Sequence, residues 1–266
     1  MSECGAASTP DAAKPNVARM YDYLLGGKEN YDSDRRAAEE LLAVVPDAAV
    51  AAWDNREFLG RAVQFLTTEA GIRQFIDIGT GLPTRGNVHT VAQQAVSDFR
   101  VVYVDYDPVV LDHARSLLAG HPNIIAIDGD LREPECILTD PSLRALIDFD
   151  KPVAILLVAI LHFITDEEAP FVAVDRLKEA MVPGSYMVIS HVTGDGIPVE
   201  AAARANELYK NTTAPGTTRT RSEILRFFDG LELIEPGLVN VASWRSQWMP
   251  VQPGRTIFYV GVGQKR

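Results

Sequence analysis

The chain of 266 residues contains 47% hydrophobic and 23% charged residues, which is the balance of an ordinary globular protein. Its formal net charge of -11 disfavours phosphate backbones and anionic lipid headgroups, so we expect it to bind neither nucleic acid nor a membrane. The two cysteines, Cys4 and Cys136, lack zinc-ligand spacing, so no metal site or disulfide framework is expected and reduced thiols in the cytoplasm are favoured. The longest apolar run, residues 153–164, is too short to span a bilayer.

The N-terminal quarter of the chain predicts helices and no strand. Residues 1–15 are small, polar and interrupted by proline, as is typical of a disordered tail. Apolar side chains then recur at the spacing of one helical face, and glycine or proline ends each predicted helix. Three helices are expected, over Val17–Leu25, Asp32–Val45 and Ala48–Ala70. We therefore expect residues 16–71 to form an N-terminal helical cap.

Strands and helices alternate from residue 73 onward. Five short apolar strands are expected, at residues 74–79, 100–105, 123–128, 152–158 and 185–191. Helices are expected between them, at residues 87–97, 108–120, 134–148 and 166–181. Strands of nearly continuous apolar character are covered on both faces, as in a parallel sheet. This alternation predicts a doubly wound α/β sheet.

The C-terminal third has a different pattern. Helices are expected at residues 198–211 and 222–228. Two strands at residues 231–236 and 255–262 follow them, with no convincing helix in between. Strands joined without a crossover helix pair antiparallel, so we expect this pair to do so.

A glycine turn follows the first predicted strand, in the sequence Asp77-Ile-Gly79-Thr80-Gly81. Ligands of open α/β sheets bind beyond the carboxyl ends of the strands, and glycine lets the backbone approach them closely. A glycine pair after a strand is also common as a simple turn. The third glycine of a dinucleotide fingerprint is missing, and Pro83 stands in its place.

Acidic residues follow the second and third predicted strands. Asp105 ends the second strand, where a carboxylate can accept hydrogen bonds from both ribose hydroxyls; the alternative is a solvated strand-end acid. Asp130 stands in the sequence Asp128-Gly129-Asp130-Leu131, where it can accept from the exocyclic amine of adenine while Leu131 packs on the ring. The alternative for Asp130 is a helix N-cap. Together the acids and the glycine turn favour an adenosine site.

A histidine follows the fourth predicted strand, in the segment from Ala159 to Phe163. His162 is a candidate general base, since imidazole titrates near neutral pH. His191, at the end of the fifth strand, is a second candidate. The alternative is that either imidazole only packs and hydrogen-bonds locally.

These motifs resemble, in order, those of the class I S-adenosylmethionine (SAM)-dependent methyltransferases. The matching segments are FIDIGTG (Phe75–Gly81), VVYVDYDP (Val101–Pro108) and AIDGDL (Ala126–Leu131), with the segment after the fourth strand. The chain more closely resembles a bacterial, mostly actinomycete, family of SAM methyltransferases whose methyl acceptor is unassigned. That likeness covers nearly the whole chain and is carried by YDYLLGGKENY (Tyr21–Tyr31), DNREFLGRAV (Asp54–Val63), GTGLPTRGNVH (Gly79–His89) and DYDPVVL (Asp105–Leu111).

The resemblance implies a Rossmann-like class I methyltransferase fold over residues 72–266, with a mostly parallel seven-stranded sheet and an antiparallel C-terminal strand. It implies SAM as the cofactor, S-adenosylhomocysteine as the product, and in-line methyl transfer to an acceptor that we expect to be a small molecule. The expected cofactor contacts are Asp77, Gly79, Thr80, Gly81, Asp105, Tyr106, Gly129, Asp130, Leu131 and Ala159.

Other expected contacts rest on weaker grounds. Tyr21, Tyr23 and Asn30 are candidates for a lid over the cofactor, and either Arg56 or His89 for pairing with the methionine carboxylate. The alternatives are core packing for Tyr21 and a surface ion pair for Arg56.

The acceptor is expected to be selected by the N-terminal helices and residues 194–221. Trp244 and Trp248 are either further acceptor-selecting residues or, as we favour, ordinary packing residues of the core. Two other functions fit the same motifs. One is an NAD(P)-dependent oxidoreductase, which shares the ribose acid but has no need of Asp130. The other is a SAM-binding protein without catalysis.

Overall fold

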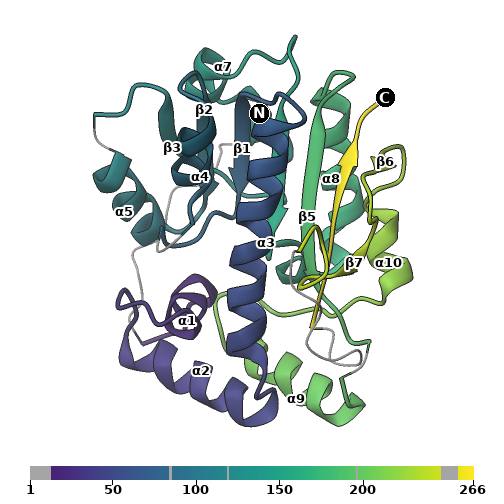
Figure 1. Cartoon of the computed structure of the whole chain (residues 1–266). Coiled ribbons are helices and arrows are strands. Elements are labelled where there is room, and N and C mark those ends of the chain that lie inside the picture. Colours follow the sequence, from purple (N-terminus) through teal and green to yellow (C-terminus); the bar gives the residue numbers. More distant parts are fainter. Residues whose placement is uncertain (1–12, 84–85, 119, 196, 247–256) are drawn as a thin grey trace.

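The computed structural model describes residues 13–83, 86–118, 120–195, 197–246 and 257–266, and these form one mixed eight-stranded sheet with helices on both faces (Figure 1). The strand order is β3-β2-β1-β4-β5-β8-β6, with β7 paired to β8. Strands β1 to β5 are parallel, and β8 runs antiparallel to β5, β6 and β7. The strands are β1 (Gln74–Ile78), β2 (Arg100–Asp105), β3 (Ile124–Asp128), β4 (Ala154–Val158), β5 (Tyr186–Val192), β6 (Glu232–Leu233), β7 (Val239–Asn240) and β8 (Phe258–Gln264). The predicted α/β class and the antiparallel C-terminal pair are confirmed, and the two-residue β7 is an addition.

Two hydrophobic cores lie on the two faces of this sheet, because successive strand residues point to opposite sides. Phe75 packs with α3, α4 and α5 on one face, whereas Ile76 packs with α6, α7, α8 and α10 on the other. The helices are α1 (Val17–Leu24), α2 (Asp32–Val44), α3 (Ala48–Thr68), α4 (Val88–Ala95), α5 (Pro108–Leu118), α6 (Pro134–Thr139), α7 (Pro141–Leu146), α8 (Pro170–Ala180), α9 (Val199–Lys210) and α10 (Arg221–Arg226), with short 3-10 turns η1 (Leu161–Phe163) and η2 (Asp166–Glu168).

Proline breaks two helices that were predicted to be continuous. The helix expected over residues 134–148 is interrupted at Pro141, and the helix expected from residue 166 begins at Pro170. Proline lacks an amide hydrogen and disfavours helical backbone in the residue before it. Accordingly, Asp140 has a ψ of 127°, outside the helical range, and Ala169 has a φ of 54°.

The N-terminal helices cover the carboxyl ends of the parallel strands. Helices α1 and α2 lie there together with α9, a helix from much later in the chain (Figure 1). The main-chain N–H of Thr213 donates to the carbonyl of Pro15 at 3.0 Å, which ties α1 to the segment after α9. Helix α3 runs from this cap along the sheet, and its second half, including Phe58 and Phe65, belongs to the core. Residues 16–71 thus supply both a cap and part of the layer that covers the sheet.

Trp244 is part of the core rather than of a site. It is fully buried, with its ring 5.4 Å from that of Phe58 and 6.0 Å from that of Phe65. The favoured packing role is therefore confirmed for Trp244, while Trp248 lies outside the described residues.

Candidate active site

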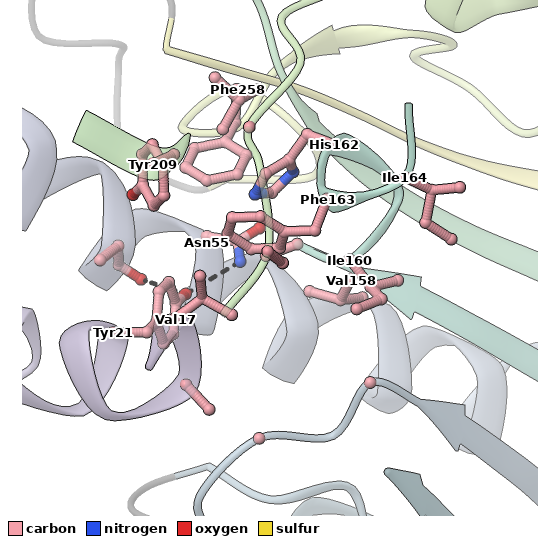
Figure 2. A pocket seen from close by; sticks show the side chains of 18 of the residues that line it. Val17, Tyr21, Asn55, Val158, Ile160, His162, Phe163, Ile164, Tyr209 and Phe258 are labelled. Carbon is pink, nitrogen blue, oxygen red and sulfur yellow. Dashed lines mark hydrogen bonds between the residues drawn. The ribbon is translucent and has the colours of Figure 1, made fainter. Parts of the chain in front are cut away.

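A cavity of about 190 Å³ lies at the carboxyl edge of the sheet, where the strand order reverses between β1 and β4. Its walls come from α1, α3, the segments after β1, β2, β3 and β4, helix α9 and residues 214–218 (Figure 2). This is the place where doubly wound sheets bind their ligands. All the cofactor contacts expected after β1 to β4 line it: Asp77, Gly79, Thr80, Gly81, Asp105, Tyr106, Gly129, Asp130, Leu131 and Ala159.

The glycine turn after β1 needs glycine for both conformation and space. Gly79 and Gly81 have φ values of 71° and 62°, in the left-handed region that other residues rarely adopt. A Cβ on Gly79 would come within 2.5 Å of the Ile160 side chain, whereas one on Gly81 would meet nothing closer than 3.9 Å. The turn therefore presents bare backbone to the cavity.

Asp105 joins this turn to the end of β2. One carboxylate oxygen accepts from the Gly81 amide at 2.9 Å, and the other accepts from the Asp107 amide at 3.0 Å. Burial raises the pKa of the Asp105 carboxyl to about 6, although these amides favour the ionised form. A carboxylate has about four acceptor positions, so Asp105 can still accept from a ribose hydroxyl.

Asp77 in β1 and Arg56 on α3 both line the cavity, and their opposite charges attract each other. Burial raises the pKa of the Asp77 carboxyl to about 6, opposed by the positive charge of Arg56 and by the Thr80 hydroxyl, which donates to the carboxylate at 3.1 Å. Arg56 lines the cavity, and its Nε is buried without a hydrogen-bond partner among the described residues. A surface ion pair for Arg56 is thus absent from the described part of the chain, and a ligand carboxylate would satisfy the guanidinium.

The segment after β3 closes the other end of the cavity. Gly129 packs so tightly that a Cβ would approach Val104 to 2.7 Å, and Leu131 is buried. The carboxylate of Asp130 accepts from the Arg132 guanidinium at 2.5 Å and from the Arg132 amide at 2.9 Å. Asp130 therefore stabilises its own turn while remaining in the cavity wall, and the alternative of a helix N-cap is wrong, because Glu133 is the N-cap of α6.

His162 stands on η1 in the cavity wall, 7% exposed. Its Nδ1 is buried without a partner in the described chain, and its ring lies 4.3 Å from that of Phe163 and 5.9 Å from that of Phe258. Burial, followed by the nearby His191 and the charge of Arg219, holds the pKa of His162 well below its ordinary value. His162 is therefore a neutral imidazole at neutral pH.

His191 is not placed to act as a base. Its Nδ1 lies 2.6 Å from the carbonyl of Val192, and its Nε2 lies 2.8 Å from the guanidinium of Arg219. A guanidinium can only donate, so Nε2 is the accepting nitrogen and Nδ1 carries the proton. Burial lowers the pKa of His191 to about 3. With both nitrogens engaged and no share in the cavity lining, His191 is a structural residue.

Three other candidates also lie away from the cavity lining. The Tyr23 hydroxyl donates to Glu39 at 3.0 Å, and the Asn30 amide donates to Asp22 at 2.7 Å. His89 pairs its Nδ1 with the Tyr103 hydroxyl at 2.7 Å. Of the pair proposed for the methionine carboxylate, only Arg56 reaches the cavity, and of the proposed lid residues only Tyr21 does.

Buried polar atoms without partners collect around this one cavity. Among the described residues, five side chains hold such atoms, and four of the five line the cavity: Asp22, Asn55, Arg56 and His162. An unpaired buried polar group costs about 1–3 kcal/mol. Their concentration at one place indicates a site built for a polar ligand.

Asn55 has an orientation that its neighbours determine (Figure 2). The Tyr21 hydroxyl donates to the carbonyl of Ala52 at 3.0 Å, so it must accept from the Asn55 amide nitrogen, also at 3.0 Å. The Asn55 Oδ1 is therefore the atom left over, and it awaits a ligand N–H or O–H.

Sequence reasoning missed Asn55, Asp22, Phe163, Tyr209 and Phe258 as cavity residues. Asn55 lies in the NREFL segment, but nothing local distinguished it from a surface helix residue. The aromatic residues join the cavity only through long-range packing. Residues 194–221, by contrast, line it as expected, through α9 and the segment that follows.

The described residues contain no group of three or more histidine, cysteine, aspartate or glutamate side chains able to hold a metal ion. Nor does any described helix have the length and apolar character needed to cross a membrane.

The chain matches one family of proteins over nearly its whole length. A family model described as S-adenosyl methyltransferase matches residues 4–266. A proposed methyltransferase of Thermobifida fusca YX is 42% identical, with a TM-score of 0.91 over 96% of this chain and 97% of that one. A DUF574-family protein of Streptomyces avermitilis MA-4680 is 38% identical, with a TM-score of 0.92 over 96% and 99%. No curated protein matches the chain.

A more distant structure shares the fold alone. Human N-acetylserotonin methyltransferase, solved in complex with SAM, is 14% identical, with a TM-score of 0.50 over 94% of this chain and 63% of that one. The glycine turn, the two strand-end acids and the whole-length family match agree on SAM as the cofactor and disfavour the NAD(P) alternative. The chain belongs to the S-adenosyl methyltransferase family and is a SAM-dependent methyltransferase.

Proposed function

We propose that this enzyme methylates a small organic molecule, and that His162 accepts the proton which the acceptor loses. The observation that carries the proposal is the buried, unpartnered imidazole of His162 in the wall of the cavity. A cytoplasmic location is part of the proposal and rests on the spacing of the two cysteines.

The charges around the cavity suit the cofactor. Its lining holds five acids, Asp22, Asp77, Asp105, Asp107 and Asp130, against two bases, Arg56 and Arg132. SAM is a net cation, because its sulfonium and ammonium outnumber its carboxylate. We assign the ribose hydroxyls to Asp105, the adenine amine to Asp130, the ammonium to Asp77 and the methionine carboxylate to Arg56.

SAM supplies a methyl group on a sulfonium, so transfer is an in-line displacement in which the C–S electron pair stays on sulfur. The protein aligns the acceptor with that methyl and excludes water. Alignment of this kind contributes up to about 7–11 kcal/mol in well-oriented systems. The cap of α1, α2 and α9 covers the carboxyl edge of the sheet and serves both purposes.

A neutral imidazole of low pKa is a weak base, and a weak base is sufficient here. As the acceptor atom forms its new bond to carbon, its attached hydrogen becomes strongly acidic. His162 therefore takes up the proton late in the transfer, when the acceptor has become a stronger acid than imidazolium.

The proposal is tested by following a radioactive methyl group from SAM into a metabolite extract. Label is expected in the small-molecule fraction and not in protein or RNA. The variant His162→Ala should reduce that transfer about 10²-fold or more, while its affinity for S-adenosylhomocysteine is unchanged.

Label in a macromolecular fraction would contradict the small-molecule acceptor. Undiminished transfer by His162→Ala would contradict the role of the imidazole. Tight cofactor binding with no transfer to any fraction would instead favour a SAM-binding protein without catalysis.

A further inference from the structure

The charged and uncharged parts of the cavity lining come from different parts of the chain; the lining up to Arg132 is called the charged half and the lining from Val158 onward the uncharged half. Every charged side chain in the lining comes from residue 132 or earlier, that is, from α1, α3, the carboxyl ends of β1 and β2, and the segments after β2 and β3. From Val158 onward, the lining contains no charged side chain among the described residues. The cofactor contacts proposed above occupy the charged half, so the uncharged half is left for the acceptor.

Four aromatic rings form the main wall of the uncharged half (Figure 2). The ring of Phe163 lies 5.5 Å from that of Tyr209, and His162 lies between Phe163 and Phe258 at ring distances of 4.3 and 5.9 Å. Such rings present apolar faces that pack well on another ring. Small aliphatic side chains from α9, including Ala202 and Ala205, continue the wall.

An ionised acceptor would be poorly solvated against this wall. Moving an unpaired carboxylate or ammonium into an apolar site costs several kcal/mol or more. An uncharged acceptor has no such penalty, and its apolar surface gains about 25 cal/mol for each Å² removed from water.

The polar groups of the uncharged half suit a single hydroxyl. The buried Nδ1 of His162 has no partner among the described residues, and Tyr209 contributes its phenol to the same lining. Burial keeps both groups neutral, raising the pKa of Tyr209 to about 12 and lowering that of His162.

A hydroxyl acceptor also matches a weak base. When methyl transfer forms the C–O bond and breaks the C–S bond, the oxygen briefly carries carbon on two sides and a proton. An oxygen in that state is a much stronger acid than imidazolium, so its proton passes to His162. A neutral amine forms an ammonium that is a weaker acid than imidazolium, so His162 would gain nothing from it.

We infer that the acceptor is an uncharged, largely aromatic or apolar hydroxyl compound, an inference that rests on the proposed function. The enzyme methylates its hydroxyl oxygen while the compound packs on the wall formed by His162, Phe163, Tyr209 and Phe258.

Three probes that share one ring system test the inference by binding alone. They are 2-naphthol, which is neutral, 6-hydroxy-2-naphthoate, an anion, and 2-naphthylmethylamine, a cation at neutral pH. Each is titrated calorimetrically into the full chain saturated with S-adenosylhomocysteine. We expect 2-naphthol to bind at least tenfold more tightly than either charged probe.

A matched pair of variants on α9 shows where the probe binds. Ala205 lines the cavity, whereas Ala203 is exposed and does not. Ala205→Glu should weaken 2-naphthol binding at least tenfold and improve binding of the cationic probe, with S-adenosylhomocysteine affinity unchanged. Ala203→Glu should change none of the three.

The inference is overturned if a charged probe binds the unmodified protein as tightly as 2-naphthol, if 2-naphthol shows no binding, or if Ala203→Glu and Ala205→Glu act alike. These outcomes are separate from failure of the proposed function. If the proposed function itself were wrong, S-adenosylhomocysteine would not bind, or no methyl label would appear in small molecules.

Discussion

At the scale of single residues, two carboxyls in the charged half of the cavity lining hold their protons more tightly in the folded protein than in the unfolded chain. Asp77 and Asp105 each have a pKa of about 6, and burial is the main cause in both. A buried acid with a raised pKa contributes stability that is complete below its unfolded pKa, near 4, and is lost as pH rises through about 6. The cofactor reverses the preference, because its ammonium and ribose hydroxyls interact best with ionised carboxylates.

The affinity for S-adenosylhomocysteine should therefore increase as the pH rises from 5 to 7 and then level off. A carboxyl of pKa about 6 that must ionise on binding changes the affinity about tenfold over that interval.

Calorimetric titrations between pH 5 and 8 measure this directly. Asp105→Asn should remove its share of the pH dependence, whereas Asp112→Asn, an exposed change on α5, should keep all of it. An affinity that is flat from pH 5 to 7 would contradict the assignment of these carboxyls to the cofactor.

Single residues also show how far sequence reasoning reached. Asp77, Asp105 and Asp130 were predicted because each lies at or just after the carboxyl end of a strand, where the fold itself puts ligands. Asn55 and Tyr209 were not, because each lies on a helix whose sequence looks the same whether that face meets solvent or a cavity. Their roles depend on packing between segments distant in the chain, which local patterns do not record.

At the scale of elements, the five parallel strands were predictable and the helix breaks were not. A strand buried on both faces has a continuous apolar run, and such runs marked β1 to β5 closely. The breaks at Pro141 and Pro170 depend on single residues within patterns that otherwise remain helical. The two-residue strand β7 is too short to have any periodicity.

Helix α1 is the element that joins the cap to the cofactor half. Its N-cap residue, Asn16, accepts from the amides of Ala18 and Arg19 through its side-chain oxygen. The side-chain nitrogen of the same residue donates to Asp107 at 2.5 Å, two residues beyond the ribose acid Asp105. One side chain thus both begins the helix and holds the loop after β2.

Asn16→Ala should therefore lower both stability and cofactor affinity. Loss of an N-cap costs about 0.5–2 kcal/mol, and the same loss is expected for Asp140→Ala, which removes the cap of α7 far from the cavity. Only Asn16→Ala should also weaken S-adenosylhomocysteine binding, because it removes the hydrogen bond to the Asp107 carboxylate. The expected loss is about tenfold, which corresponds to roughly 1.4 kcal/mol for one hydrogen bond to a charged group. Thermal melting and calorimetry of both variants provide the comparison. Equal cofactor affinity in the two variants would show that Asn16 serves only its helix.

At the scale of the whole molecule, two segments far apart in the sequence meet over the active site. Pro15 accepts from the Thr213 amide at 3.0 Å, and the Val17 amide donates to the Thr213 hydroxyl at 3.3 Å. Helix α2 also packs against α9. The helices that cover the cofactor half are thereby linked to the helix that lines the acceptor half.

This link predicts that the cofactor protects both helices together. Binding of S-adenosylhomocysteine should slow amide hydrogen exchange in α1 and also in α9, although no contact assigned to the cofactor lies on α9. The reason is that local opening of either helix requires the hydrogen bonds at Thr213 to break. Helix α7, which lines no part of the cavity, is the internal control and should exchange at a nearly unchanged rate. Thr213→Val, which removes the hydroxyl but keeps the amide, should reduce the protection of α9 more than that of α1. Protection confined to α1 in the unmodified protein would contradict the link and would mean that the two helices open independently.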